Sequence, residues 1–504
     1  MRVERFLTDS AKRFPDKVAL VAGGRRLSFR ELDAMSDRLA GALARRGLAR
    51  GDRAIVFMDN CWEAAVAIFA VLKAGGVFSP INPSTKADKL AYVINNCRAA
   101  AVLSQPRLLP VMDEALAACP SVKFSMTAGR DLDAALSQEL APPPVPGIDL
   151  DLCMLVYTSG STGFPKGVMM THQNVVAAAT SITSYLENTP DDIILNVLPI
   201  SFDYGLYQLL MAVKVGATLV LEKSFAFPQA IFNRMQEEKV TGLPLVPTMA
   251  ALILQMKDLA PGAFPHLRYI TNTAAALPPA HILRLQALFP GSRIYSMYGL
   301  TECKRCTYLP PAELARRPGS VGIAIPGTEA YVVDEHGERA KPGEVGELVI
   351  RGAHVMKGYW ENPEATDKAL KPGPFPWEKV LHTGDLFRTD ADGFLYFVGR
   401  KDDIIKSRGE KVSPKEVENV LYALPGVREA VVIGVPDPIL GQAVKAVLAL
   451  EPGCDLTAQN VIRHCARHLE DFMVPKLVEF RAELPKTESG KISRRMVSVL
   501  EAAE

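Results

Sequence analysis

The chain has 504 residues, 48% of them hydrophobic and 22% charged, and its 57 lysines and arginines against 56 aspartates and glutamates leave a formal net charge of +1. This composition is typical of a globular protein long enough for one large and one small domain, and the balanced charge argues against nucleic-acid binding, which a basic excess would mark. Because no run approaches roughly 18 uncharged apolar residues and no signal peptide is visible, we expect a cytoplasmic protein without a transmembrane segment.

The first 140 residues or so alternate between helices and strands. Ser28 and Glu31 form a capping box that starts a helix, which Gly47 ends. A strand is expected over 54–58, a helix over 61–74 and a further strand from 77, which is the strand–helix–strand unit of a parallel sheet. The proline-rich stretch 141–147 cannot continue a helix or a central strand, so we interpret it as a connector within the domain. The pattern predicts doubly wound α/β structure.

From about residue 402 the pattern changes. Ser413, Pro414 and Glu416 start a capped helix. Strands are expected over 430–435 and 443–450, a helix over 457–469 and a last strand over 477–481. These elements predict a compact α+β module.

The most informative segment is Tyr157-Thr-Ser-Gly-Ser-Thr-Gly-Phe-Pro-Lys-Gly-Val168. Its glycines and hydroxyl residues can place N–H and O–H groups around phosphate oxygens, while Lys166 supplies positive charge. It is not a Walker loop, because the pattern G-x-x-x-x-G-K-[S/T] does not fit. The segment predicts a phosphate-binding loop, with a flexible linker as the alternative.

Further motifs follow in a fixed order. They are Ser296-Met-Tyr-Gly-Leu-Thr-Glu302, Gly346-Glu-Leu-Val-Ile-Arg-Gly352 with Gly358-Tyr359, His382-Thr-Gly-Asp-Leu386, Gly399-Arg-Lys-Asp-Asp-Ile-Ile-Lys406 with Arg408-Gly409-Glu410, and Pro485-Lys-Thr-Glu-Ser-Gly-Lys-Ile492. Together with the loop, they make the chain closely resemble the adenylate-forming superfamily of acyl-CoA synthetases, nonribosomal-peptide adenylation domains and beetle luciferase. The resemblance covers nearly the whole chain.

The resemblance implies a fold, a reaction and a set of cofactors. The fold is α/β, with a large multi-subdomain N-terminal domain over 1–401 that binds ATP and the acid, and a small mobile α+β C-terminal domain over 402–504 that pivots near Asp402. A carboxylic acid and ATP with Mg²⁺ give an acyl-adenylate and pyrophosphate. A thiol, from coenzyme A or from the phosphopantetheine arm of a carrier protein, then displaces AMP. Because a carboxylate is a poor nucleophile toward a polyanion, the first step needs positive charge at the phosphates.

The resemblance also assigns roles to single residues. Thr301 contacts the α-phosphate, Glu302 holds Mg²⁺, and Lys491 bridges the substrate carboxylate and the phosphate in adenylation. Tyr298 flanks the adenine, and Asp385 with Arg400 behind it binds the ribose hydroxyls. Gly409 leaves room for the pantetheine arm in the second orientation of the small domain. The resemblance assigns binding of the β- and γ-phosphates to the loop, here Thr158, Ser159, Gly160, Ser161, Thr162, Gly163 and Lys166.

The acid pocket is the least defined part. Many fatty and aryl acid enzymes of the family carry histidine in a P-x-x-H-x-x-G pattern, where this chain has Phe202 followed by Asp203. Phe-Asp resembles amino-acid-activating members, in which the aspartate pairs with the substrate ammonium, although Gly205 stands where those members usually have serine. The expected pocket residues are Phe202, Asp203, Tyr207, Asn272, Met297 and Arg305.

These residues favour a small amino or polar acid, with a medium- or long-chain fatty acid as the alternative. Asp203 has a second interpretation, as the N-cap of a helix. Arg305 either pairs with a second carboxylate on the substrate or points outward. From other classes, a luciferase-type oxygenase shares every motif, whereas an inactive nucleotide-binding regulator is disfavoured by the presence of Glu302, Asp385 and Lys491.

Overall fold

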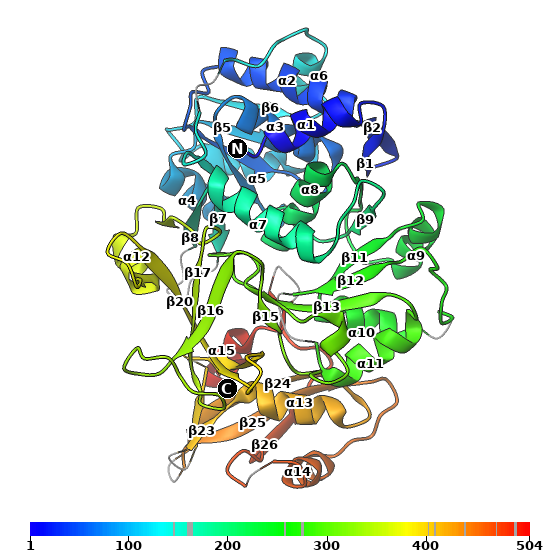
Figure 1. Ribbon diagram of the computed structural model, residues 1–504, viewed down its shortest axis with the longest axis vertical. Coiled ribbons are helices and arrows are strands. Elements are labelled where there is room, and N and C mark those ends of the chain that lie inside the picture. The colour runs from blue at the N-terminus through cyan, green and yellow to red at the C-terminus, as the bar shows by residue number, and fades with distance from the viewer. Residues whose placement is uncertain are drawn as a thin grey trace.

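The computed structural model describes residues 1–144, 147–158, 165–256, 259–273, 277–401, 403–407, 410–437, 440–469, 471–487 and 491–503. In Figure 1 the large N-terminal domain runs from blue to yellow, and the small C-terminal domain lies below it in orange and red. The predicted α/β fold with a small α+β domain at the C-terminus is confirmed.

A seven-stranded sheet of the described residues carries the stem of the predicted phosphate-binding loop. Strands β7, β4, β3, β5 and β6 run parallel, and β8 and β18 extend this sheet antiparallel at one edge. The predicted strand–helix–strand unit is confirmed as β3, α3 and β4, with α3 spanning Trp62–Lys73. In sheet order the strands are β18 (Gly358–Tyr359), β8 (Lys166–Thr171), β7 (Leu152–Thr158), β4 (Val77–Ile81), β3 (Arg53–Phe57), β5 (Ala101–Ser104) and β6 (Phe124–Thr127).

A nine-stranded sheet packs beside the first, and one hydrophobic core spans both and includes the buried middle of α3. Most of its strands are parallel, with β2, β14 and β15 antiparallel at the two edges. Its order is β15 (Ile323–Ala324), β14 (Thr307–Tyr308), β13 (Arg293–Tyr298), β12 (Tyr269–Asn272), β11 (Gly242–Leu245), β9 (Ile193–Asn196), β10 (Thr218–Leu221), β1 (Val18–Ala22) and β2 (Arg25–Ser28).

Helices cover these sheets. The predicted capped helix is α2 (Phe29–Arg45), in which Ser28 and Glu31 make both hydrogen bonds of the capping box. Of the proline-rich connector, residues 141–144 and 147 belong to no helix or strand. The other helices of the large domain are α1 (Arg5–Arg13), α4 (Ala87–Cys97), α5 (Leu109–Leu116), α6 (Asp131–Leu136), α7 (His172–Tyr185), α8 (Asp203–Val215), α9 (Pro228–Glu237), α10 (Pro247–Gln255), α11 (Pro279–Leu288) and α12 (Pro363–Ala369), with 3-10 turns at Pro106–Leu108 and Pro311–Glu313.

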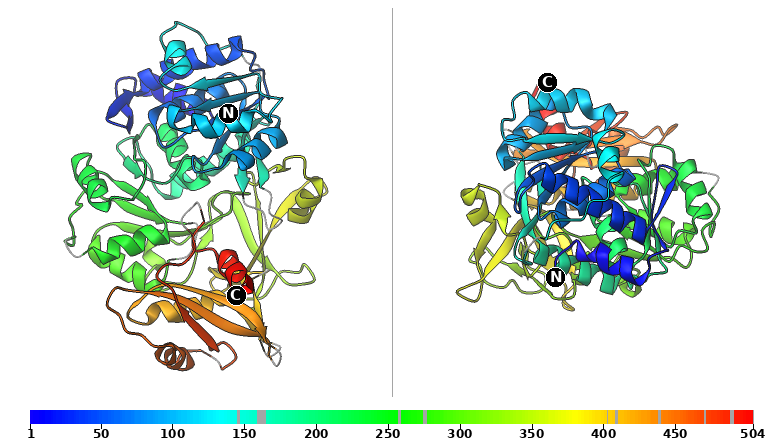
Figure 2. Two further views of the ribbon diagram at one scale, coloured as in Figure 1. Left: turned by 180° about the vertical axis from the view of Figure 1, so that it is seen from behind. Right: turned by 90° about the horizontal axis from the view of Figure 1, so that it is seen from above.

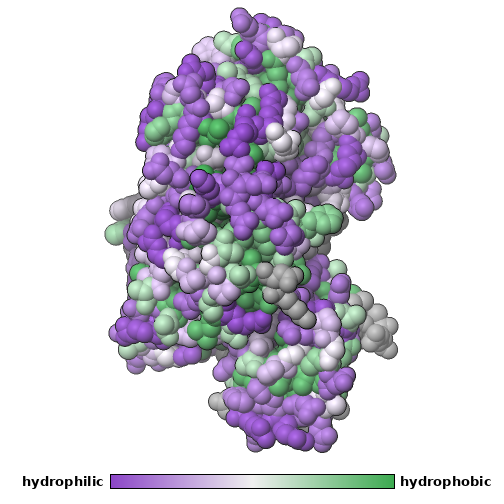
Figure 3. Space-filling view, turned by 90° about the vertical axis from the view of Figure 1, so that its right-hand side faces the viewer, coloured by the Kyte–Doolittle hydropathy of each residue, from purple (hydrophilic) through white to green (hydrophobic). Residues whose placement is uncertain are grey.

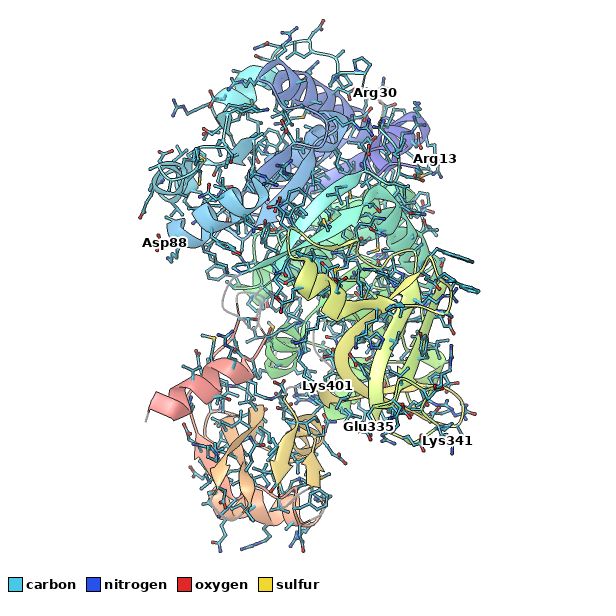
Figure 4. The ribbon with its side chains drawn as sticks, turned by 90° about the vertical axis from the view of Figure 1, so that its left-hand side faces the viewer. Arg13, Arg30, Asp88, Glu335, Lys341 and Lys401 are labelled. Atoms are coloured by element: carbon cyan, nitrogen blue, oxygen red, sulfur yellow. The ribbon has the colours of Figure 1, made fainter. Side chains whose placement is uncertain are left out.

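A third, antiparallel sheet completes the large domain and leads into the small one. Its strands are β16 (Thr328–Val333), β17 (Gly346–Gly352), β20 (Lys379–Thr389) and β19 (Leu370–Pro372), and β21 (Leu395–Arg400) pairs with β20. Lys401, at the end of this sheet, lies where the large domain faces the small one (Figure 4). The expected hinge residue, Asp402, lies outside the described residues.

The small domain is a sheet with helices, as predicted, and Figure 2 shows it from behind and from above. Ser413 caps α13 (Pro414–Ala423), and Thr457 caps α14 (Ala458–Ala466). Three of its elements were not predicted from the sequence: β22 (Ile405–Ser407), β23 (Glu410–Val412) and α15 (Arg494–Ala503). The predicted strands are β24 (Val427–Asp437), β25 (Gly441–Leu450) and β26 (Leu477–Phe480).

The two domains touch through α11 and α13. The ring of His281 in α11 packs edge-on against the ring of Tyr422 in α13, with the ring centroids 5.9 Å apart. On the face shown in Figure 3, hydrophobic residues are scattered among hydrophilic ones, and the small domain forms the narrower lower lobe. Within the described part of the chain, no helix combines the length and apolarity that crossing a membrane requires.

Candidate active site

A buried carboxylate lies at the junction of the second and third sheets. Asp385 in β20 faces Arg400 in β21 across the strand pair, and Arg400 Nε lies 3.3 Å from Asp385 Oδ1. The Tyr298 hydroxyl donates a hydrogen bond to Asp385 Oδ2 at 2.6 Å. Burial raises the pKa of Asp385, while Arg400 and the tyrosine hydrogen bond oppose the rise. One hydrogen bond and one ion pair thus orient the carboxylate that was predicted to bind the ribose hydroxyls.

Tyr298 occupies its place through packing as well as this hydrogen bond. Its ring lies edge-on to Phe387, with centroids 4.9 Å apart, and tilted to Phe397 at 6.3 Å. That its ring flanks an adenine stays a prediction. The contacts indicate a second role for Tyr298, because its hydroxyl holds the Asp385 carboxylate in place.

The phosphate-binding loop itself, with Ser159, Gly160, Ser161, Thr162 and Gly163, lies outside the described residues. Its two ends are defined, since Thr158 of β7 pairs with Lys166 of β8. Lys166 Nζ lies 5.3 Å from the centroid of the Tyr359 ring. The predicted loop therefore connects the paired ends of β7 and β8. Strand β18, which carries Tyr359, pairs with β8.

Glu302 is connected to the same edge. Thr301 and Glu302 lie in the turn that follows β13, and the Tyr359 hydroxyl donates to Glu302 Oε1 at 2.7 Å. The main-chain N–H of Met356 donates to the Glu302 carbonyl oxygen at 2.7 Å. Tyr359 was not assigned a role from the sequence, although the Gly358-Tyr359 motif marked its position. The structure brings Lys166, Tyr359 and Glu302 together.

Lys491 reaches this site from the small domain. Its main chain is held by Thr487, whose N–H donates to the Lys491 carbonyl at 2.7 Å and whose Oγ1 accepts from the Lys491 N–H at 3.2 Å. Burial lowers the pKa of Lys491, while the carboxylates of Asp203 and Asp385 favour its charged form and Arg400 opposes it. The Lys491 ammonium group therefore lies within electrostatic reach of both Asp203 and Asp385. Gly409, assigned to the other orientation, lies outside the described residues.

Asp203 is the first residue of α8, and the predicted alternative that it caps this helix is wrong. The N-cap position belongs to Phe202, and no side chain caps the helix there. Phe202 is half-buried against the core. The glycine after Asp203 has a steric cause, because a Cβ on Gly205 would lie 2.3 Å from the Pro199 carbonyl oxygen. The serine of amino-acid-activating members could not occupy this position without a backbone shift.

The other predicted pocket residues, Tyr207, Asn272, Met297 and Arg305, are buried. Tyr207 is fully buried and its hydroxyl has no hydrogen-bond partner in the described structure. Asn272 ends β12, and Met297 Sδ accepts a hydrogen bond from the Tyr185 hydroxyl at 2.9 Å. Arg305 does not point outward, since its side chain is buried and its guanidinium carbon lies 4.5 Å from the centroid of the Tyr204 ring.

Sequence reasoning missed Lys304, which neighbours Arg305. It is 2% exposed, and its Nζ lies 5.6 Å from the centroid of the Tyr207 ring without a hydrogen-bond partner among the described residues. Burial lowers its pKa, while the carboxylates of Asp203 and Glu302 favour the charged form. A lysine in a turn is ordinarily exposed, so no pattern in the sequence marks this one.

Comparison with known proteins gives consistent matches. Residues 7–360 match the AMP-binding enzyme family, and residues 416–491 match the AMP-binding enzyme C-terminal domain. A long-chain-fatty-acid–CoA ligase of Bacillus subtilis (strain 168) is 32% identical over 98% of this chain and 93% of its own length. A feruloyl-CoA synthase of Amycolatopsis sp is 34% identical over 96% and 95%. The structure of ATP-bound MatB from Rhodopseudomonas palustris superimposes with a TM-score of 0.90 at 29% identity, covering 99% of both chains.

Proposed function

The chain belongs to the AMP-binding enzyme family, as an ATP-dependent, AMP-forming acyl-CoA synthetase, and we propose that the acid it activates is small and polar. Such an enzyme forms an acyl-adenylate and pyrophosphate from the acid and ATP, and the thiol of coenzyme A then displaces AMP. The relatives act on acids as different as long-chain fatty acids and ferulate, so family membership does not select the acid. The polar, buried surroundings of Asp203 and Arg305 support the choice of a polar one.

The observation that carries the proposal is the position of Lys491. In adenylation the carboxylate attacks the α-phosphate, so two anions approach and negative charge accumulates between them. The influence of Asp203, in the proposed acid pocket, and of Asp385, at the proposed ribose site, on the Lys491 ammonium group supports a role for this cation where that charge develops. We assign Lys491 to this step, with Thr158, Lys166 and Thr301 at the phosphates and Asp385 and Arg400 at the ribose.

The proposal includes Mg²⁺, with Glu302 as the residue that would hold it. Magnesium in nucleotide enzymes is held by one or two carboxylates together with substrate phosphates rather than by a cage of protein ligands. Glu302 offers one hydrogen-bonded carboxylate beside Lys166 and Tyr359, and the described residues contain no cluster of three metal-ligating side chains. The donor set therefore fits a phosphate-bound magnesium ion, which would neutralise phosphate charge when bound.

We also propose that the chain divides near Asp402, with residues 1–401 and 402–504 as the two bodies, and that rotation of the small body brings Gly409 to the site for thioester formation. A pantetheine arm on a carrier protein presents the same thiol as coenzyme A. Both acceptors therefore belong in the assay of the second step.

The test is ATP–pyrophosphate exchange that depends on an added acid. A panel of amino, hydroxy, dicarboxylic, aryl and long-chain fatty acids is compared at equal concentration. We expect exchange with small polar acids. A preference for a long-chain fatty acid would overturn the proposed substrate, and formation of thioester only with a carrier protein would overturn coenzyme A as acceptor.

A further inference from the structure

Two adjacent cationic side chains are buried in the wall of the predicted acid pocket. Lys304 and Arg305 are each 2% exposed, and they follow Glu302 in the turn between β13 and β14. The turn is tightly packed, since a Cβ on Gly299 would lie 1.7 Å from the Lys304 carbonyl oxygen. Lys304 itself has a left-handed φ of 64°. The backbone is thus fixed in a form that directs both side chains inward.

These cations carry hydrogen-bond donors without acceptors. Within the described residues, neither Lys304 Nζ nor Arg305 Nε has a hydrogen-bond partner, and the same is true of the Tyr207 hydroxyl and Thr307 Oγ1. Both cations lie over tyrosine rings, Arg305 over Tyr204 and Lys304 over Tyr207. A ring face attracts a cation but accepts none of its directional hydrogen bonds, so burial still leaves these donors unsatisfied.

The charge balance of the site is also incomplete. Lys304, Arg305, Lys491 and Arg400 bring four positive charges, and the neighbouring carboxylates are Asp203, Glu302 and Asp385, the last of which pairs with Arg400. Glu302 accepts from Tyr359 and is assigned to the phosphate side. Asp203 interacts with two lysines already, Lys304 and Lys491, so a substrate ammonium would be a third cation at one carboxylate. This arrangement favours an anion as the incoming group.

We infer that the acid carries a second carboxylate, which Arg305 binds with Lys304 alongside, while its first carboxylate meets Lys491. A planar guanidinium suits a carboxylate because two parallel N–H groups match two oxygens. This inference rests on the proposed function and makes its polar acid a dicarboxylic acid.

The experiment measures kcat/KM in ATP–pyrophosphate exchange for oxalate, malonate, succinate, glutarate and phthalate, each beside its monoamide. The monoamide keeps size and shape and removes one charge. Butyrate, decanoate and β-alanine complete the panel. We expect the wild-type protein to prefer at least one dicarboxylate over its monoamide by about 100-fold or more, since a site built for a charged partner leaves its donors unpaired with the neutral analogue.

Variants locate the preference. Arg305→Gln is expected to lower kcat/KM for the preferred dicarboxylate by about 100-fold and to leave the monoamide unchanged, and Lys304→Met is expected to act in the same direction more weakly. Arg316→Gln is the matched control, because Arg316 is exposed and pairs only with Glu313 among the described residues. If Arg305 had only a structural role, Arg305→Gln would instead lower kcat/KM equally for every acid.

Each outcome decides a separate statement. Exchange with none of the acids would overturn the proposed function. Exchange with butyrate, decanoate or β-alanine but with no dicarboxylate would overturn this inference and keep the ligase. If Arg305→Gln does not fold, the wild-type comparison of dicarboxylate and monoamide decides, and equal rates would overturn the inference.

Discussion

Replacing Lys491 by alanine should separate the two half-reactions. The change removes the ammonium group that interacts with Asp203 and Asp385 and leaves both carboxylates in place. Adenylation then loses a cation where the acid meets the phosphate. We expect the loss to fall on adenylation alone, because Lys491 belongs to the small domain and would leave the site in the proposed rotation of that domain.

The magnitude follows from the surroundings of the lysine. Removing one well-placed donor from a water-excluded site costs about 10²- to 10³-fold in rate, or about 2.7–4 kcal/mol. Here the two carboxylates also remain without this counter-charge, so repulsion of the incoming anions adds to the loss. We therefore expect exchange to fall by about 10³-fold, at the upper end of that range.

Two assays check this prediction. ATP–pyrophosphate exchange reports adenylation, and thioester formation from a synthetic acyl-adenylate and coenzyme A reports the second step. Lys486→Ala is the matched control, because Lys486 lies five residues earlier on the same segment and pairs with Glu429 of the small domain at 2.6 Å. Equal damage to both half-reactions, or full exchange activity in the variant, would refute the assignment.

Three further predictions concern the fold, the acceptor path and the domain contact. Gly205→Ala places a Cβ 2.3 Å from the Pro199 carbonyl oxygen, so we expect a loss of about 1–3 kcal/mol in unfolding free energy, measured by denaturant titration, whereas Gly319→Ala, with open space at its Cβ, should be neutral. Gly409→Leu should keep pyrophosphate exchange and abolish thioester formation, measured with coenzyme A; normal thioester yield would contradict the assigned path. Burial lowers the pKa of His281, in the large domain, from 6.5 to about 4 in the docked state, so undocking of the small domain lets His281 bind an additional proton between these values. Docking should be complete above about pH 6.5 and weaken as the pH falls toward 4, observed by fluorescence transfer between the domains, and His281→Gln should reduce this dependence; an unchanged pH profile would contradict it.

The sequence predicted helices, strands and motifs better than it predicted which distant residues contact one another. The capping box at Ser28 and the strand–helix–strand unit at 53–81 are local, because neighbouring residues decide them. The three unpredicted elements of the small domain are short or lie at its end. Strand pairing and packing against distant residues define such segments, and a local pattern contains neither.

The site shows the same division. Motif spacing placed Asp385 and Arg400 on adjoining segments, and the strand pair joins them. The contact of Tyr359 with Glu302 spans 57 residues, and the inward position of Lys304 depends on how one turn packs on Gly299. These contacts depend on the tertiary fold, so no local pattern in the sequence marks them. The burial of Lys304 and Arg305 is the part of the acid pocket that only the structure could reveal.

The attachment of Lys491 has a consequence for the direction of the reaction. A group that speeds adenylation also speeds its reversal, in which pyrophosphate attacks the adenylate, because both directions share one transition state. Lys491 is fastened to Thr487 of its own domain, so any departure of that domain removes the cation from the site. The intermediate would then lose the group that catalyses its return to ATP. Movement of the small domain would thereby slow the attack of pyrophosphate on the adenylate while the thiol approaches.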